Sequence, residues 1–234
     1  MQPVYRRILL KLSGEALSGY AQGGSCIDGA FLSTLCREIE RMVKLGVQVA
    51  IVCGGGNIWR GRTVPDMDHT RADQAGMLAT VINGLALQDA LLRQKVKAEL
   101  FTAFEMGPVA RRYTRADALS VLEGGGVAIL AAGTGHPYFT TDSAAALRAA
   151  ELEVDAILMA KTIDGVYTAD PKKDKDATFL PEITCSEALY RRLGVMDATA
   201  MALCMDNRIT IRVFAMDPLD NLLKVVCGQP IGSV

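Results

Sequence analysis

The sequence has no excess of charge of either sign and no long apolar run. Its 25 Lys and Arg residues stand against 26 Asp and Glu residues, which gives a formal net charge of −1. Proteins that bind nucleic acid normally carry a basic face, so this balance argues against nucleic acid as the main partner. The apolar stretch near the N-terminus is broken by Lys11, and no stretch reaches the length of a signal-peptide core or a membrane span. We therefore expect a cytoplasmic protein with no membrane partner.

Histidines and paired cysteines are also scarce. The two histidines, His69 and His136, lie far apart in the sequence, and the six cysteines form no Cys-x-x-Cys pair. Zinc sites use several such ligands, often at short spacing, so we do not expect a metal site built from histidine or cysteine. Without an export signal, the cysteines are expected to be reduced thiols.

Apolar residues, in contrast, are abundant, and they occur in alternating strand-like and helix-like segments. Half of the 234 residues are hydrophobic, which is enough for a substantial core. The alternation predicts an α/β fold in which a mostly parallel sheet is covered by helices on both faces. We expect strands at 6–12, 47–53, 96–101, 127–131, 156–159 and 209–215, and helices at 28–44, 71–94, 115–122, 143–151, 185–192, 197–206 and 219–226.

Local signals refine this outline. Asp28 is of a residue type that caps helices, so we expect it to begin the helix at 28–44. Gly124–Gly126 precedes a strand, and it is predicted to end a helix and form a turn. The segment 170–181 carries two prolines and many charges, and we expect a surface loop there. The chain is therefore predicted to be a single domain, 1–234, with two lobes.

Ligands of an open parallel sheet bind where the strands end and loops lead into helices. At the first such junction Lys11 is followed by Ser13 and Gly14, whose backbone N–H groups can meet an anion. The alternative is a lysine that extends to solvent before an ordinary turn. The second junction carries Gly54–Asn57 and then Arg60, and its glycines let a polyanion approach the backbone. The spacing of a Walker A loop is absent.

Two further junctions add hydroxyl, acidic and aromatic side chains. Thr140, Thr141 and Asp142 precede a predicted helix, so they either cap it or bind a polar ligand. Asp142 is also placed to orient Lys11 or to reach a metal-bound water. The segment 161–171 contains Tyr167, whose ring either stacks on a purine or packs in the protein. Together the four junctions predict a cleft that handles phosphate.

With these motifs in place, the chain resembles the bacterial uridylate kinases of the amino acid kinase superfamily. The similarity covers nearly the whole chain in the order of the family. The matching segments are Lys11–Leu17, Gly54–Asn57 with Arg60-Gly61, Asp73 with Gly76–Thr80, Asn83–Ala86, Ala132–Gly135, Phe139–Ala145, Asp164–Pro171, Val195–Asp197 and Ile211–Phe214.

The resemblance implies transfer of the γ-phosphoryl group of ATP to UMP, which gives UDP and ADP in pyrimidine nucleotide biosynthesis. It implies a three-layer α/β/α sandwich with a mostly parallel, eight-stranded open sheet, dependence on Mg²⁺ and a homohexamer. The Mg²⁺ is expected on the nucleotide phosphates with few protein ligands. UMP would bind the N-terminal lobe, about 1–150, and ATP the C-terminal lobe, about 151–234. UTP and GTP are possible effectors.

The resemblance also assigns roles to single residues. Lys11, Arg60 and Asp142 would be catalytic, with Asp142 orienting Lys11, because the UMP phosphate is already anionic and needs no base. Asp73 would accept hydrogen bonds from the ribose hydroxyls, which disfavours a deoxyribose acceptor. ATP would contact Lys11, Leu12, Ser13, Gly14, Gly56, Arg60, Lys161, Tyr167 and Asp170. UMP would contact Gly55, Asp73, Thr134, Gly135, His136, Pro137, Tyr138, Phe139, Thr140 and Thr141.

Three departures from the family pattern concern these roles. His136 stands where the family usually has Asn, so we expect uracil to be read by an imidazole. Met159–Thr162 stands where family members commonly read Lys-Ala-Thr-Lys, which leaves Lys161 as the candidate second cation. The loop 18–26 is longer and richer in glycine than usual, and regulation by nucleotides is expected to differ accordingly.

Two other functions stay open at this point. One is an acylphosphate-forming kinase of the same superfamily that acts on glutamate, aspartate, acetylglutamate or carbamate, although such an acceptor would not need Asp73. The other is a nucleotide-binding sensor or storage protein without turnover. The presence of Lys11, Arg60 and Asp142 argues against it, because a non-catalytic protein could lose any of them.

Overall fold

The centre of the protein is a sheet of parallel strands. The structure is a computed structural model that describes residues 2–19, 25–61 and 66–234. Within these residues the sheet has seven strands in the order β4-β3-β5-β2-β1-β6-β9, and every neighbouring pair is parallel. The strands are β1 (Arg7–Leu12), β2 (Gln48–Cys53), β3 (Ala98–Thr102), β4 (Arg111–Arg112), β5 (Val127–Ala131), β6 (Ala156–Lys161) and β9 (Thr210–Ala215).

The inner strands form because their residues are apolar on both faces. All five residues of β5 are buried, as are five of the six in β2 and in β6. Continuous β-branched and aliphatic runs of this kind are typical of a parallel sheet covered on both sides. Alternate residues of β1 show the two faces: Ile8 and Leu10 join one buried cluster, and Leu9 joins the other.

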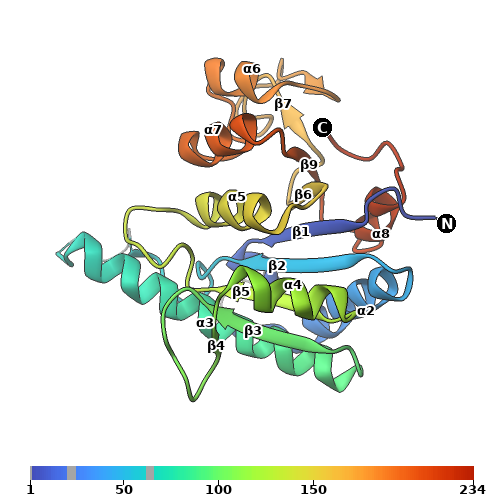
Figure 1. Ribbon diagram of the computed structural model, residues 1–234. Helices are drawn as coiled ribbons and strands as arrows, with labels where there is room; N and C mark the ends of the chain where they lie inside the picture. Colours follow the sequence, from blue (N-terminus) through green and yellow to red (C-terminus); the bar gives the residue numbers. More distant parts are fainter. Residues whose placement is uncertain (1, 20–24, 62–65) are drawn as a thin grey trace.

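Helices cover each face of the sheet, so the protein has three layers (Figure 1). One apolar cluster contains residues of α2 (Gly29–Lys44), α3 (His69–Arg93) and α8 (Asn221–Val226). The other contains residues of α4 (Arg115–Glu123), α5 (Thr141–Leu152), α6 (Cys185–Tyr190) and α7 (Ala198–Asp206).

The predicted α/β sandwich and each predicted strand and helix are confirmed, with bounds that shift by at most three residues.

The structure differs from the expectations in several small elements. The sheet has seven strands in the described part of the chain rather than eight. The helix α1 (Gly14–Leu17) lies in a predicted loop, and β7 (Val166–Tyr167) pairs with β8 (Phe179–Leu180) in a separate antiparallel sheet. These elements, like β4, are two to four residues long, which is too short for a periodic apolar pattern.

The predicted helix ends are confirmed. Asp28 caps α2 by accepting hydrogen bonds from the backbone N–H groups of Ala30 and Phe31. Gly124 follows α4 directly, and Gly125 adopts a φ of +74°, a backbone conformation that favours glycine. The Gly124–Gly126 triplet is therefore a helix end, as its position before a strand predicts.

Helix α3 has an unexpected property. By length and composition alone its 25 residues could cross a membrane, but half of its most apolar window is buried inside the protein. A core helix of a globular domain passes the same test. The buried residues of α3 include Met77, Val81, Leu87 and Leu91, and they pack in the core beside α2.

Candidate active site

The four loops that carry the predicted chemistry lie side by side at one edge of the sheet. They follow β5, β2, β1 and β6, and these strands are consecutive in the sheet order. Because the strands are parallel, all four loops leave from the same edge. The structure therefore brings the four predicted junctions together at one edge of the sheet.

Lys11 and Asp142 form the central ion pair of this edge. Lys11 Nζ lies 2.7 Å from Asp142 Oδ1, and the two side chains are 16% and 22% exposed. Lys11 stands near the end of β1, and Asp142 lies in the first turn of α5. A carboxylate at this distance holds the ammonium in one position while leaving it within reach of solvent or a ligand. The predicted orienting contact between the two residues is present.

The glycines of the first two loops allow these loops to touch. A Cβ on Gly14 would lie 2.6 Å from the backbone N of Gly56, a separation that real side chains do not adopt. On Gly55 it would lie 2.8 Å from Ala79 Cβ and 2.9 Å from the carbonyl oxygen of Gly76. The loops after β1 and β2 are therefore packed backbone to backbone, which places their N–H groups close together beside Lys11.

Two asparagines hold the glycine loop Gly54–Asn57 in place through hydrogen bonds. Asn83 is fully buried in α3, and its Nδ2 donates to the carbonyl oxygen of Gly54 at 2.7 Å and to Asn57 Oδ1 at 2.8 Å. Asn57 Nδ2 in turn donates to the carbonyl oxygen of Cys26. Buried amides with satisfied hydrogen bonds fix a loop in one conformation, so these two residues hold the shape of the loop.

Arg60 folds back over the same loop. Its Nε donates to the carbonyl oxygen of Gly56 at 3.0 Å, and its terminal nitrogen lies 2.6 Å from Glu15 Oε1. Ser13 caps the short helix α1 by accepting a hydrogen bond from the N–H of Ala16. The predicted phosphate-binding residues after β1 and β2 are thus brought together, with the partly exposed Arg60 on their outer side.

On the β5 side, the loop from Thr134 to Thr141 runs beside the start of α3. Asp73 Oδ2 accepts a hydrogen bond of 2.7 Å from the backbone N of Tyr138, which joins the two predicted UMP-binding segments. Thr140 accepts hydrogen bonds from the N–H groups of Asp142 and Ser143 and caps α5. Its hydroxyl also donates to Asp197. The capping interpretation of Thr140 is therefore confirmed.

Several other residues of this loop are exposed to solvent. His136 is exposed, and its backbone N donates to Thr134 Oγ1 at 3.2 Å. Phe139 is half exposed, and Gly135 adopts a φ of +84°. A loop of hydroxyls and exposed rings next to a carboxylate suits a polar, planar ligand.

On the β6 side, a cavity of about 570 Å³ opens between two loops. Three predicted ATP-binding residues, Lys161, Tyr167 and Asp170, lie in its lining together with Lys172, Arg191 and Arg192. Tyr167 donates its hydroxyl to Asp164 at 2.8 Å, which raises its pKa, and its ring meets Phe179 edge to face. The cavity combines positive charge with a ring surface, as a nucleotide requires.

Lys161 connects this cavity to the central ion pair. Its ammonium donates to the carbonyl oxygens of Val195 at 2.6 Å and Gly194 at 3.1 Å. Burial lowers the pKa of Lys161, the Asp142 carboxylate raises it, and the Lys11 ammonium lowers it further. Lys161 ends β6, the strand that pairs with β1, where Lys11 is opposite Met159, and its side chain also lines the cavity.

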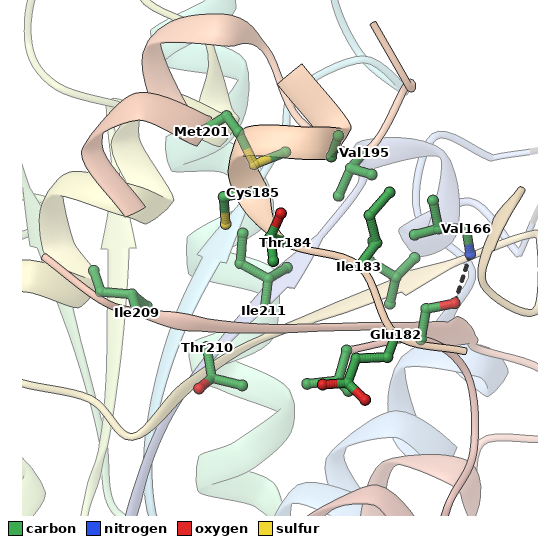
Figure 2. A pocket seen from close by; sticks show the side chains of 14 residues that line it. Val166, Glu182, Ile183, Thr184, Cys185, Val195, Met201, Ile209, Thr210 and Ile211 are labelled. Carbon is green, nitrogen blue, oxygen red and sulfur yellow. Dashed lines mark hydrogen bonds between the residues drawn. The ribbon is translucent and has the colours of Figure 1, made fainter. Parts of the chain in front are cut away.

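Figure 2 shows a second cavity. It has a volume of about 260 Å³, and its walls include Ile183, Cys185, Met201 and Ile211. Val166 borders both cavities, and its backbone N donates to Ser233 Oγ. The lining of this second cavity is mainly apolar and contains none of the predicted site residues, but Val195 and Val213 also line both cavities.

Comparisons with known proteins agree with this geometry. Residues 6–215 match the amino acid kinase family, which is most of the chain. The chain belongs to the amino acid kinase family. Solved structures that resemble this amino acid kinase include three kinases of UMP or uridylate. A UMP kinase from Bacillus anthracis is 35% identical with a TM-score of 0.94, and the match covers 98% of this chain and 95% of that chain.

The other two similar structures are also kinases of uridylate. A UMP kinase from Ureaplasma parvum is 42% identical with a TM-score of 0.89, covering 99% of this chain and 98% of that one. A uridylate kinase from Archaeoglobus fulgidus is 25% identical with a TM-score of 0.75, covering 97% and 98%. The two bacterial structures share more sequence with this amino acid kinase than the Archaeoglobus fulgidus structure does.

Sequence reasoning missed several residues that build the site of this amino acid kinase. Four such residues contact a predicted site residue or its loop: Asn83, Glu15, Asp197 and His69. Glu15, Asn83 and Asp197 fall inside the matched segments, which were the signal available for them, whereas His69 lies outside every matched segment. The loop between Ser18 and Cys26, where altered regulation is expected, lies partly outside the described residues.

Proposed function

We propose that this amino acid kinase is a UMP kinase, which transfers the γ-phosphoryl group of ATP to UMP and releases UDP and ADP. The observation that carries the proposal is the position of the Lys11–Asp142 ion pair, with the 570 Å³ cavity on one side and the Asp73 loop on the other. Similarity to two bacterial UMP kinases over nearly the whole chain supports the choice of UMP.

The chemistry needs little beyond position and positive charge. An oxygen of the UMP phosphate attacks the γ-phosphorus of ATP, the new P–O bond gives UDP, and the bond to the β-phosphate oxygen breaks to leave ADP. Lys11 stabilises the negative charge on the transferred group, and Asp142 keeps the ammonium in place. Backbone N–H groups near Gly14 and Gly56 donate hydrogen bonds to the remaining phosphate oxygens.

The two nucleotides are proposed to bind different lobes. UMP occupies the N-terminal lobe, where Asp73 meets the ribose and the 134–141 loop, including His136, meets the base and phosphate. ATP occupies the C-terminal lobe, with its adenosine in the cavity beside Tyr167 and Asp170. Lys161 reaches toward Lys11 from that side, which makes it the candidate second cation on the donor phosphates.

Magnesium is proposed to arrive with ATP. The described residues contain no group of three or more His, Cys, Asp or Glu side chains that could hold a metal ion. Mg²⁺ normally binds phosphates and water with one or two carboxylates, so a site poor in protein ligands fits a Mg-nucleotide. When bound, the ion would neutralise charge on the β- and γ-phosphates.

A homohexamer is proposed for the assembly. Four large hydrophobic residues of α3, Leu78, Ile82, Leu85 and Leu92, are 39–53% exposed. Their spacing places them along one side of the helix, and an exposed apolar stripe of this kind suits contact with a second copy. Placement in the cytoplasm and in pyrimidine nucleotide biosynthesis, with UTP or GTP as effectors, follows from the same proposal.

A coupled ADP-release assay with a panel of acceptors tests the function. With Mg-ATP present, we expect turnover with UMP and much less with CMP, dUMP or glutamate. Comparable rates with UMP and CMP would show that His136 relaxes base recognition. Activity with glutamate alone would assign the chain to the acylphosphate-forming kinases, and binding of both nucleotides without ADP release would assign it to non-catalytic proteins.

A further inference from the structure

His69 and Tyr138 form a stacked pair over the carboxylate of Asp73. Their ring centroids are 4.5 Å apart and their planes differ by only 7°. His69 Nδ1 lies 3.2 Å from Asp73 Oδ2, the same oxygen that accepts the hydrogen bond from the backbone N of Tyr138. One carboxylate oxygen therefore joins the start of α3 to the loop after β5.

The backbone of Tyr138 explains why this loop needs support. Tyr138 has a φ of +69°, a left-handed conformation that is disfavoured for residues with a Cβ. Such conformations persist only where surrounding contacts hold them, and they gather at functional sites. The Tyr138 side chain is 73% exposed, so core packing does not supply that support. Its described contacts are the hydrogen bond to Asp73 and the ring of His69.

The contacts from His69 Nδ1 and from the backbone N–H of Tyr138 both use Oδ2 of Asp73, which leaves Oδ1 for the acceptor. Oδ1 of the same carboxylate is the oxygen that can accept a hydrogen bond from a sugar hydroxyl. His69 also limits rotation of the carboxylate, because turning it would break the contacts of His69 Nδ1 and the Tyr138 N–H together. The position of Oδ1 is thereby fixed before a ligand binds.

We propose that His69 is a positioning residue of the acceptor site. By stacking on Tyr138 and binding Asp73, it holds the acceptor loop in its left-handed conformation and aims the free carboxylate oxygen at the ribose hydroxyls. This inference rests on the proposed function for its acceptor, UMP. It adds that a histidine touching no reacting atom sets the affinity for the acceptor and the preference for ribose over deoxyribose.

The test compares three variants of exposed residues. His69→Ala removes the ring and its Nδ1 contact with Asp73, and His69→Phe restores the ring alone. Gln74→Ala is the matched control, because Gln74 is an exposed residue of the same helix beside Asp73. The His69 side chain is 61% exposed, so its replacement is not expected to unfold the protein.

We expect His69→Ala to raise KM for UMP about tenfold, with kcat and KM for ATP within twofold of the wild type. The rate ratio between UMP and dUMP should fall by a similar factor, because the carboxylate is no longer aimed. His69→Phe should recover part of the UMP affinity, and Gln74→Ala should change neither value. An unchanged KM for UMP in His69→Ala would overturn the proposal, as would a parallel loss of kcat and of affinity for both nucleotides.

A binding measurement separates this inference from the proposed function. Trp59 is the one tryptophan of the chain, and its Nε1 donates to the carbonyl oxygen of Ala72, next to Asp73. Its fluorescence therefore provides a signal for UMP binding without turnover. Weaker UMP binding in His69→Ala than in the control supports the positioning role even if ADP is never released. Equal binding in both variants contradicts that role, whereas a wild type that binds UMP without turnover contradicts the kinase alone.

Discussion

Lys11 of β1 and Asp142 of α5 meet at 2.7 Å at the carboxyl edge of the sheet. In the proposed mechanism the lysine supplies the charge that transfer requires, and the aspartate restricts where that charge lies. The UMP phosphate is already anionic and needs no base, and the Asp142 carboxylate is engaged by the Lys11 ammonium. The pair therefore fits electrostatic positioning rather than acid–base chemistry.

Removal of either member of this pair should lower turnover. Lys11→Ala is expected to reduce kcat about 10²–10³-fold, the effect of losing one transition-state charge contact, while KM for UMP stays nearly unchanged. Asp142→Asn keeps the shape of the side chain and should reduce kcat less, because the lysine remains but is poorly held. Steady-state kinetics with both nucleotides varied measure this. Normal turnover in Lys11→Ala would remove it from the catalytic site.

The carboxylate of Asp73 should affect the binding of UMP and leave the binding of ATP unchanged. Asp73→Ala deletes the partner of the Tyr138 N–H and the proposed ribose contact, so KM for UMP should rise at least tenfold, about the cost of one charge-assisted hydrogen bond. KM for ATP should stay within twofold. Isothermal titration with each nucleotide separates the two sites. If UMP affinity in Asp73→Ala equals that of the wild type, Asp73 does not belong to the acceptor site.

Lys161 should make ATP binding sensitive to alkaline pH. Burial lowers its pKa below the ordinary lysine value, so its charged form is lost at lower pH than for an exposed lysine. The ammonium is the form that binds phosphate. We therefore expect KM for ATP to rise as pH increases through that lowered pKa.

The matched variants for this prediction are Lys161→Met and Lys161→Arg. The methionine variant should have a high KM for ATP at every pH, because it never carries the charge. The arginine variant stays charged and should lose the alkaline rise. Identical pH profiles of KM in the wild type and Lys161→Met would exclude Lys161 from the donor site.

The close packing at Gly55 should make this position intolerant of a side chain. In Gly55→Ala the new Cβ would lie 2.8 Å from Ala79 Cβ and 2.9 Å from the carbonyl oxygen of Gly76. We expect the free energy of unfolding to fall by about 1–3 kcal/mol, as for an overpacked core. Gly29→Ala is the control, because a Cβ there meets nothing within 4 Å. Urea denaturation of both variants measures the difference, and equal midpoints would contradict the packing argument.

The exposed stripe of α3 should control the assembly. Replacing Leu78 and Leu85 by Asp places charges on the proposed contact face, and we expect the homohexamer to dissociate. Light scattering after size exclusion measures the mass. The control is Leu45→Asp, which alters an exposed leucine just after α2. A double variant that keeps the mass of the wild type would show that this face does not join the copies.

The sequence predicts the layers of the fold because its inner strands are continuous apolar runs. It also predicts that the candidate site residues gather at one edge of the sheet, since unusual residues follow four strands and parallel topology collects them there. The sequence does not predict the hydrogen bonding of Asn57 with Asn83 or the stacking of His69 on Tyr138. These contacts join segments far apart in the chain, and no periodic pattern encodes them. Two-residue strands such as β7 are missed for the related reason that they are too short to show a period.

The most direct test of the central claim is ³¹P NMR of the complete reaction, with Mg-ATP, UMP and the purified protein. The proposed function predicts that the UMP signal disappears while the α- and β-phosphate signals of UDP grow, together with those of ADP in equal amount. Lys11→Ala should slow both changes alike. ATP loss with growth of inorganic phosphate instead of UDP, or no change in the UMP signal, would contradict the assignment as a UMP kinase.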